Sequence, residues 1–297
     1  MAIAAIEAGG TKFICALFDD GGREQIRVRI ETGDPSRTLD EVRAFFLENS
    51  THDPVSSVGI GSFGPINVDP DSENYGCILQ TPKTAWIGVN LRTAIQTALA
   101  VPVSVETDVN VAALAESEAA GEAVQSLVYV TVGTGIGVGI ALEGRLLPLR
   151  RHPEIGHLRP RRSPGEQAAF AGVCPYHGDC LEGVAAGPAM RARWGQAAET
   201  LPPDHEAWDL EADYLAQGVA SLMLSFSPDR LVLGGGVMEQ QGMFERIRDE
   251  AHRLLGGYLE YASERAVLDR IVVPPSLGGD AGIRGAYLIG RQLDRSR

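Results

Sequence analysis

Two apolar strand pairs, each folded about a glycine turn, recur along the chain. The first covers Ala2–Phe18, with a Gly-Gly-Thr turn at Gly9–Thr11, and it ends in an acidic-glycine turn. The second covers Leu127–Leu147, with a Gly-Thr-Gly turn at Gly133–Gly135, and it ends in the same way. Apolar runs joined by a short glycine turn are typical of β-hairpins. A hairpin that opens each half of the chain predicts two domains of related topology.

Strands and helices alternate through the rest of both halves. The predicted strands are Val58–Ile60, Val101–Val105, Arg230–Leu233 and Ile271–Val273, and the predicted helices are Leu39–Asn49, Val109–Ala120, Met243–Leu255 and Ala281–Arg291. Residues Leu201–Trp208 are predicted to form a loop. The segment Arg150–Gly183 has little periodicity and is rich in Gly, Pro, His and Cys. Alternation of strands and helices indicates an α/β fold.

The length of the chain favours two domains, because 297 residues exceed what a single core requires. We expect a smaller α/β domain at residues 1–118 and a larger α/β domain at residues 119–278. The C-terminal helix, within residues 279–297, can return to the first domain.

Charge and hydropathy limit the classes of function. The chain has 26 Lys and Arg against 39 Asp and Glu, a net charge of −13, which disfavours non-specific binding to nucleic acid or to anionic membranes. No apolar run reaches the ~18 residues that span a bilayer. The N-terminus lacks the basic region of a signal peptide. We therefore expect a cytoplasmic protein that binds neither nucleic acid nor membrane.

Three glycine clusters follow predicted strands and are candidate phosphate-binding loops. They are Gly9-Gly10-Thr11-Lys12, Gly133-Thr134-Gly135-Ile136-Gly137 and Gly234-Gly235-Gly236-Val237. Glycine lets backbone N–H groups approach a phosphate, and Thr adds a hydroxyl donor. Each cluster alone is equally consistent with an ordinary tight turn. The three together favour a nucleotide held between two domains, although the chain has neither a P-loop nor a dinucleotide-binding fingerprint.

The string Glu106-Thr107-Asp108-Val109-Asn110 marks the junction of a predicted strand and helix. Thr107 or Asp108 can simply cap the helix N-terminus. Asp108 can instead act as a general base that accepts a hydroxyl proton during phosphoryl transfer. The sequence does not favour one interpretation over the other.

A Cys-x-x-His-x-x-Cys string predicts a metal site. Cys174, His177 and Cys180 lie on one short segment, and His157 supplies a fourth ligand from nearby. Two nitrogen and two sulfur ligands match tetrahedral zinc, and a closed set of four ligands is typical of a structural site. The other two cysteines, at positions 15 and 77, are expected to be packing thiols, and we expect no disulfide framework in a cytosolic chain.

Two carboxylates flank this metal segment. Glu154 precedes His157 by three residues, and Glu182 follows Cys180 by two. Glutamate is usually a solvated surface residue. The alternative is that these carboxylates accept hydrogen bonds from the hydroxyl groups of a sugar.

Taken together, these residues resemble the ROK family of bacterial sugar kinases, most closely its zinc-containing fructokinases. The resemblance covers essentially the whole chain. The matching strings are Glu7-Ala-Gly-Gly-Thr-Lys12, Gly61-Ser-Phe-Gly-Pro65, Thr81-Pro-Lys83, Thr107-Asp-Val-Asn110, Gly133-Thr-Gly-Ile-Gly137, His152-Pro-Glu-Ile-Gly-His157, Cys174-Pro-Tyr-His-Gly-Asp-Cys180 and Leu233-Gly-Gly-Gly236. The fold implied is an actin-like (ribonuclease H-like) duplicated α/β fold, with two lobes around a central cleft.

The resemblance also implies roles for individual residues. Asp108 is the implied catalytic base. The implied ATP contacts are Gly9, Gly10, Thr11, Lys12, Gly133, Thr134, Gly135, Gly137, Gly234, Gly235 and Gly236. The implied sugar contacts are Gly64, Pro65, Thr107, Asp108, Glu154, His157 and Glu182. The implied zinc ligands are His157, Cys174, His177 and Cys180. Mg²⁺ would accompany ATP, and a homodimer is usual in similar proteins.

The function implied is transfer of the γ-phosphoryl group of ATP to fructose. Three departures from the usual family pattern are Glu7 in place of Asp, His177 in place of a cysteine, and Thr107 in place of the Asn of glucokinases. Phosphorylation of mannose, glucose or an N-acetylated hexosamine is the close alternative. A sugar-sensing regulator and a non-catalytic sugar-binding protein are the less favoured alternatives, because the chain is acidic and carries Asp108.

Overall fold

The computed structural model describes residues 1–51, 53–163, 166 and 170–295. Several residues of the segment Arg150–Gly183, and the last two residues of the predicted C-terminal segment 279–297, lie outside the described residues. The chain divides into two units, which are described separately. Unit 1 comprises residues 1–119, 146–152 and 279–297, and unit 2 comprises residues 120–145 and 153–278. The predicted division into domains 1–118 and 119–278 stays a proposal, which this clustering supports.

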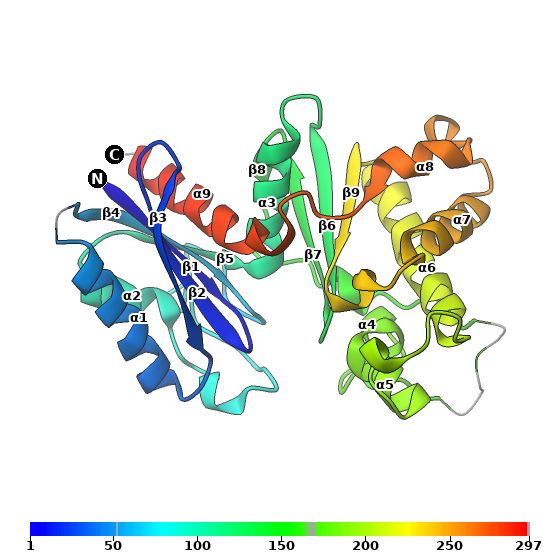
Figure 1. Ribbon diagram of the computed structural model, residues 1–297, viewed down its shortest axis with the longest axis horizontal. Helices are drawn as coiled ribbons and strands as arrows, with labels where there is room; N and C mark the ends of the chain where they lie inside the picture. Colours follow the sequence, from blue (N-terminus) through cyan, green and yellow to red (C-terminus); the bar gives the residue numbers. More distant parts are fainter. Residues whose placement is uncertain (52, 164–165, 167–169, 296–297) are drawn as a thin grey trace. The chain divides into compact units, whose positions relative to one another are not determined.

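Unit 1 is built on a five-stranded sheet in the order β3-β2-β1-β4-β5. Its strands are β1 (Ala2–Ala8), β2 (Lys12–Phe18), β3 (Glu24–Glu31), β4 (Val55–Ser62) and β5 (Val103–Thr107). Its helices are α1 (Pro35–Asn49), α2 (Leu91–Leu99), α3 (Asp108–Ala120) and α9 (Ala281–Arg295), with short 3-10 turns at Thr84–Trp86 and Gly278–Asp280. Helices α1 and α2 cover one face of the sheet and α9 covers the other (Figure 1). The return of the C-terminal helix to the first sheet explains why the apolar face of α9 is buried.

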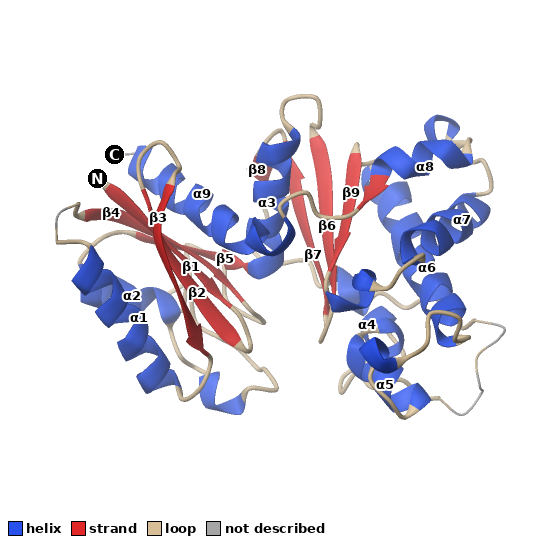
Figure 2. Ribbon diagram, viewed as in Figure 1, coloured by secondary structure: helices blue, strands red, loops and turns tan. Residues whose placement is uncertain are grey.

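Unit 2 repeats this arrangement with the order β10-β9-β6-β7-β8. Its strands are β6 (Ser126–Val132), β7 (Ile136–Leu142), β8 (Arg145–Leu146), β9 (Arg230–Gly234) and β10 (Val272–Val273). Its helices are α4 (Leu181–Ala185), α5 (Gly187–Trp194), α6 (Ala207–Phe226), α7 (Met243–Leu255) and α8 (Arg265–Ile271), with 3-10 turns at Ile155–His157, Ala198–Thr200, Gly236–Glu239 and Glu260–Ala262. Figure 2 shows these helices gathered beside the sheet.

The two sheets have matching strand pairings. In unit 1, β1 pairs with β2 antiparallel and with β4 parallel, and β4 pairs with β5 parallel. In unit 2, β6 pairs with β7 antiparallel and with β9 parallel, and β9 pairs with β10 parallel. The predicted hairpin at the start of each half therefore leads into the same topology twice.

Most predicted elements lie within a few residues of their observed bounds. The loop predicted at Leu201–Trp208 is shorter than expected, since α6 already begins at Ala207. Trp208 is 2 % exposed, and its indole N–H donates to Pro202 O at 2.9 Å. Because the large ring of Trp208 is buried, the last residues of the expected loop belong to α6.

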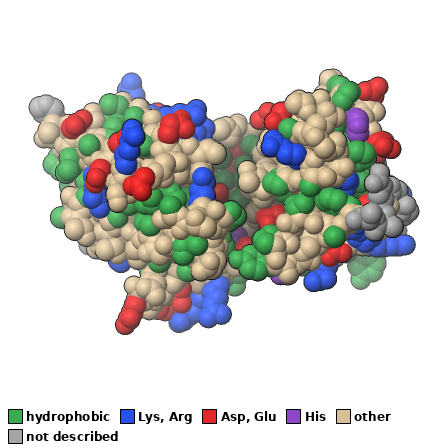
Figure 3. All heavy atoms as spheres, turned by 90° about the horizontal axis from the view of Figure 1, so that it is seen from below, with side chains coloured by type: hydrophobic (Ala, Val, Ile, Leu, Met, Phe, Trp, Pro, Cys, Tyr) green, Lys and Arg blue, Asp and Glu red, His purple; other side chains and the backbone are tan. Residues whose placement is uncertain are grey.

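The surface carries charges of both signs. On the face drawn in Figure 3, acidic, basic and hydrophobic side chains are interspersed. In the part of the chain that the structure describes, no helix is long and apolar enough to cross a membrane.

Candidate active site

The carboxyl ends of three parallel strands in unit 1 meet at one edge of the sheet. The register aligns Ala8 of β1 with Ser62 of β4, and Ser62 with Thr107 of β5. The first glycine hairpin follows β1 directly and Asp108 follows β5 directly, while the Gly64-Pro65 dipeptide follows β4 after one intervening residue. Ligands of α/β proteins bind outside the carboxyl ends of parallel strands. The structure therefore brings the candidate residues of unit 1 to one edge of its sheet.

Asp108 is the first residue of α3 and begins where β5 ends. Its Oδ1 accepts a hydrogen bond from the N–H of Val109 at 2.9 Å. Burial raises the pKa of Asp108 to about 6, while backbone N–H donors from Val109 and Asp108 itself act in the opposite direction. A carboxylate with this pKa is ionised near neutral pH and remains a competent proton acceptor.

The hydroxyl of Thr107 is the cap of α3. Its Oγ1 accepts from the N–H of Asn110 at 3.2 Å and lies 3.3 Å from Nδ1 of His152. Burial lowers the pKa of His152 to about 4, so the ring is neutral near pH 7. The hydroxyl of Thr107 can donate a hydrogen bond to Nδ1 of the neutral ring, while its oxygen accepts from the N–H of Asn110. Capping by Thr107 and base chemistry by Asp108 are thus compatible.

Two residues beside the candidate base were not assigned a role from the sequence. Glu106 accepts from the Nδ2 of Asn110 at 2.9 Å and from the N–H of Thr107 at 3.3 Å. Burial raises the pKa of Glu106, and these two donors lower it. The sequence signal that could have identified this contact is the spacing of four residues between Glu106 and Asn110, which brings two side chains together at the start of a helix. The contact of His152 with Thr107 had no local sequence signal beyond the motif that contains His152, because the two residues are 45 positions apart.

The first glycine hairpin lies next to a buried carboxylate. The N–H of Gly9 donates to Lys12 O at 2.9 Å, and the hydroxyl of Thr32 donates to Gly9 O at 2.8 Å. Burial raises the pKa of Glu7, which Lys12 lowers and Asp108 raises. Glu7, Lys12 and Asp108 therefore interact electrostatically, and the hairpin presents a cation beside two carboxylates.

The two glycine clusters of unit 2 also share one edge of a sheet. The register aligns Thr131 of β6 with Gly234 of β9, so Gly133–Gly137 and Gly234–Gly236 follow neighbouring strand ends. The tip of the hairpin is held by Glu182, whose Oε2 accepts from the N–H of Ile136 at 3.0 Å. A Cβ on Gly135 would lie 2.6 Å from that oxygen, so this contact requires glycine.

The four predicted metal ligands of unit 2 converge. Their donor atoms all lie within 4.8 Å of one another. Nδ1 of His157 is 3.4 Å from Sγ of Cys180 and 3.8 Å from Sγ of Cys174, and Nδ1 of His177 is 3.6 Å from Sγ of Cys174. Tetrahedral zinc with Zn–S of ~2.3 Å and Zn–N of ~2.05 Å places sulfur and nitrogen about 3.6 Å apart. The residues therefore fit a zinc ion.

Glu154, His157 and Glu182 lie close enough to influence one another. Burial raises the pKa of Glu154, which His157 lowers and Glu182 raises. Because Nδ1 of His157 faces the two sulfurs, Nε2 is the ring nitrogen that remains for another contact. Oε2 of Glu182 accepts from the hairpin, and no described residue donates a hydrogen bond to its other oxygen. This set can offer several acceptors to a polyol.

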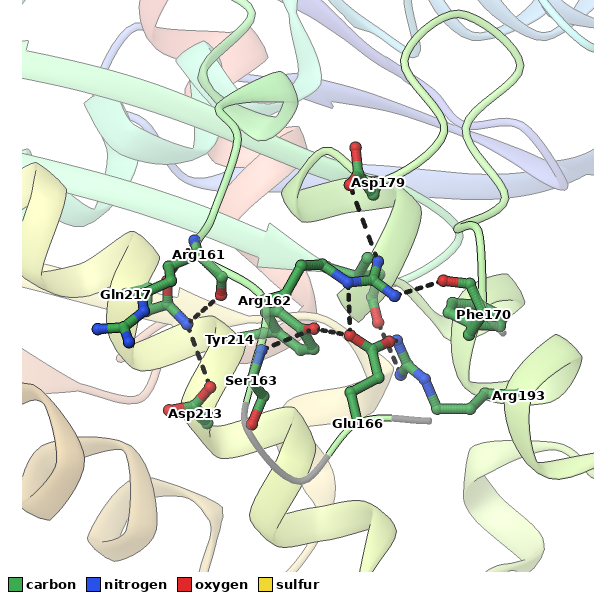
Figure 4. A network of polar contacts seen from close by, with 11 residues as sticks. Arg161, Arg162, Ser163, Glu166, Phe170, Asp179, Arg193, Asp213, Tyr214 and Gln217 are labelled. Carbon is green, nitrogen blue, oxygen red and sulfur yellow. Dashed lines mark hydrogen bonds and ion pairs between the residues drawn. The ribbon is translucent and has the colours of Figure 1, made fainter. Parts of the chain in front are cut away.

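A network of ionic contacts, buried at Glu166 and Arg193, joins the metal segment to its surroundings (Figure 4). Arg162 contacts Asp179 at 4.0 Å, and its Nε lies 2.8 Å from Glu166. Glu166 also accepts from Arg193 at 2.9 Å and from the hydroxyl of Tyr214. The side chains of Glu166 and Arg193 are 2 % and 5 % exposed. No local sequence pattern indicated this network, because Arg193 and Tyr214 lie 27 and 48 positions from Glu166 along the chain.

Comparisons with known proteins agree with this geometry. The family model described as the ROK family matches residues 3–292. The chain is 40 % identical over 290 residues to a fructokinase of Pediococcus pentosaceus, which covers 97 % of each chain. It is 40 % identical over 289 residues to a fructokinase of Zymomonas mobilis subsp. mobilis, which covers 96 % of this chain and 94 % of that protein. The crystal structure of a ROK hexokinase from Thermus thermophilus superposes with a TM-score of 0.81 at 26 % identity, over the full length of both chains. This likeness and the two matching sheets confirm the predicted duplicated α/β fold.

Proposed function

Because the chain belongs to the ROK family of sugar kinases, we propose that it transfers the γ-phosphoryl group of ATP to the 6-hydroxyl of fructose, giving fructose 6-phosphate and ADP. Relatives at 40 % identity over nearly the whole chain confirm the predicted enzyme class. The choice of fructose rests on the names of those relatives. The observation that carries the chemistry is the partly buried Asp108 at the carboxyl edge of the unit 1 sheet.

Asp108 is the proposed general base. Its carboxylate takes the proton of the sugar hydroxyl as that oxygen forms a bond to the γ-phosphorus. The bond between the γ-phosphorus and its bridging oxygen breaks, and that oxygen leaves with ADP. Thr107 and Glu106 hold the first turn of α3, which orients the carboxylate.

The proposed nucleotide contacts are backbone groups of the glycine clusters. Successive N–H groups and the hydroxyls of Thr11 and Thr134 can donate to phosphate oxygens. The proposed contacts are Gly9, Gly10, Thr11, Lys12, Gly133, Thr134, Gly135, Gly137, Gly234, Gly235 and Gly236. Mg²⁺ bound to ATP would neutralise part of the charge on the phosphates.

The proposed sugar contacts are Gly64, Pro65, Thr107, Asp108, Glu154, His157 and Glu182. Zinc held by His157, Cys174, His177 and Cys180 is proposed to be structural, because four protein ligands leave no open position for substrate. The metal would fix the ring of His157 through Nδ1, so that Nε2 can contact a sugar hydroxyl. We also propose a homodimer, which sedimentation analysis can test.

Release of ADP, measured with fructose, mannose, glucose and N-acetylated hexosamines, tests the proposal. We expect the largest kcat/KM with fructose and loss of turnover in the Asp108→Asn variant. Turnover in that variant equal to wild type would exclude Asp108 as the base. Absence of ADP release with every hexose would refute the kinase assignment.

A broader hexose kinase is the second candidate. The likeness to a protein named ROK hexokinase, at a TM-score of 0.81, favours it. Hexoses differ by single hydroxyl positions, so comparable kcat/KM values for fructose and glucose in the same assay would select this alternative.

A further inference from the structure

The chain contains almost no lysine. Of its 26 Lys and Arg residues, only Lys12 and Lys83 are lysines. They lie 71 positions apart in the sequence, in unit 1. The structure nevertheless brings both to the first glycine hairpin. Lys12 follows the turn of this hairpin directly, and the side chain of Lys83 lies against Gly10 in the turn.

The stem of Lys83 lies over Gly10. A Cβ added to Gly10 would be 3.1 Å from Cε of Lys83 and 3.9 Å from its Cδ. Real Cβ atoms rarely meet a neighbour this closely, so glycine at position 10 leaves room for the lysine stem. The ammonium group, one bond beyond Cε, is thereby held beside the hairpin that is proposed to bind phosphate.

The backbone of Lys83 is firmly anchored. Lys83 precedes the 3-10 turn Thr84–Trp86, and the N–H of Trp86 donates to Lys83 O at 2.9 Å. Trp86 is 2 % exposed and packs against the rings of Phe13 and Phe63, at centroid distances of 5.4 Å and 6.0 Å. Because the backbone at Lys83 is already fixed by these contacts, its ammonium group loses less conformational entropy when it binds a ligand.

Lys83 has no counter-charge in the part of unit 1 that the structure describes. No carboxylate oxygen lies within 4.0 Å of its nitrogen, whereas many arginines of this acidic chain are paired in this way. Lys12 differs, because it attracts the buried carboxylate of Glu7 and lowers its pKa. An unpaired cation beside a glycine hairpin is suited to bind an external oxyanion.

We propose that Lys83 is a catalytic residue whose ammonium donates hydrogen bonds to the γ-phosphoryl oxygens of ATP. This inference rests on the proposed kinase function. Lys83 keeps its proton throughout. It stabilises negative charge on the equatorial oxygens while the bond to the sugar oxygen forms and the bond to the ADP oxygen breaks. Lys12 approaches from within the hairpin, and Lys83 adds a second positive charge from the adjoining turn.

Substitution at position 83 provides the kinetic test. Lys83→Met keeps most of the stem that covers Gly10 and removes the charge, whereas Lys83→Arg keeps the charge. We expect kcat to fall about 100-fold in Lys83→Met, with at least tenfold recovery in Lys83→Arg. Affinity for ADP, which lacks the γ-phosphoryl group, should change less than twofold. The surface variant Arg23→Met is the matched control and should retain wild-type kcat.

Three results would overturn this assignment. The first is a kcat of Lys83→Met within threefold of wild type. The second is a loss confined to the KM for fructose, which would assign Lys83 to the sugar. The third is an equal loss of affinity for ADP and for a non-hydrolysable ATP analogue, which would assign it to the α- or β-phosphate.

Chemical labelling of the wild-type protein gives an independent readout that does not need a variant to fold. An amine-selective reagent can modify only Lys12, Lys83 and the N-terminal amine, so mass spectrometry can quantify each site. A non-hydrolysable ATP analogue with Mg²⁺ should protect Lys83 at least tenfold more than ADP does. Equal labelling of Lys83 with and without the analogue refutes the contact. Wild-type protein that releases no ADP with any hexose refutes the kinase function instead, so the two failures are distinguishable.

Discussion

The pKa of Asp108 predicts how the reaction rate depends on pH. Only the ionised carboxylate can accept the sugar proton, so activity is lost as pH falls through its pKa. Burial raises that pKa to about 6. At this value about nine tenths of the carboxylate is ionised at pH 7 and about one tenth at pH 5. We therefore expect kcat/KM for fructose to fall about tenfold between pH 7 and pH 5, and about tenfold for each further unit.

The assay is the initial rate of ADP release from pH 4.5 to pH 8 at saturating Mg-ATP. Because ATP also binds protons, nucleotide affinity is measured over the same range and its contribution is divided out. His152 serves as an internal control, because burial lowers its pKa to about 4, below the expected midpoint. A His152→Phe variant should keep the midpoint near pH 6.

The Asp108→Asn variant separates the base from other titrating groups. We expect a residual rate lower by ~10²–10⁴-fold, since that is the usual contribution of a positioned general base. The residual rate should have no acidic limb near pH 6. A wild-type profile that stays flat down to pH 5, or the same limb in the Asn variant, would refute the reasoning.

Three further predictions concern the supports of the site. Thr107→Val removes the acceptor of the Asn110 N–H and should lower the free energy of thermal unfolding by about 1–2 kcal/mol. Thr107→Ser keeps the hydroxyl and should leave that free energy unchanged. Equal losses in the two variants would show that the hydroxyl is not the cap. His177→Ala should reduce bound zinc from about one per chain and raise the KM for fructose but not for ATP, and an unchanged metal content by elemental analysis would remove His177 from the ligand set. Arg193→Met leaves the carboxylate of Glu166 without the more buried of its two arginine partners and should lower the free energy of unfolding in urea by about 3–5 kcal/mol. A loss under 1 kcal/mol would contradict a stabilising role for this pair.

The strands of both hairpins were predictable, but some elements were not. Hairpins β1–β2 and β6–β7 combine apolar runs with glycine turns, so their pattern is local. Strand β3 (Glu24–Glu31) was missed because it is an edge strand whose arginines and glutamates face solvent. Helix α6 (Ala207–Phe226) was missed for the opposite reason. It is buried on much of its circumference, which weakens the amphipathic period.

The candidate site shows the same division between local and tertiary information. Cys174, His177 and Cys180 are neighbours in sequence, so their convergence with His157 was predictable from spacing. The contact of Thr107 with His152 joins residues 45 positions apart, and that of Glu166 with Arg193 joins residues 27 positions apart. Such contacts depend on the tertiary arrangement of the loops against the sheets, which no local sequence pattern predicts.

Glu182 shows why the functions of neighbouring loops in unit 2 are difficult to separate. Its Oε2 holds the N–H of Ile136 in the second glycine hairpin, which is proposed to bind phosphate. Its other oxygen remains for the proposed sugar contact, and Cys180, a proposed zinc ligand, lies two residues earlier. A movement of the metal segment would therefore displace a carboxylate that also orders the hairpin. The proposed metal, sugar and nucleotide sites consequently share one side chain, and a KM for ATP that is unchanged in His177→Ala would show that the contact of Glu182 with the hairpin survives loss of the metal.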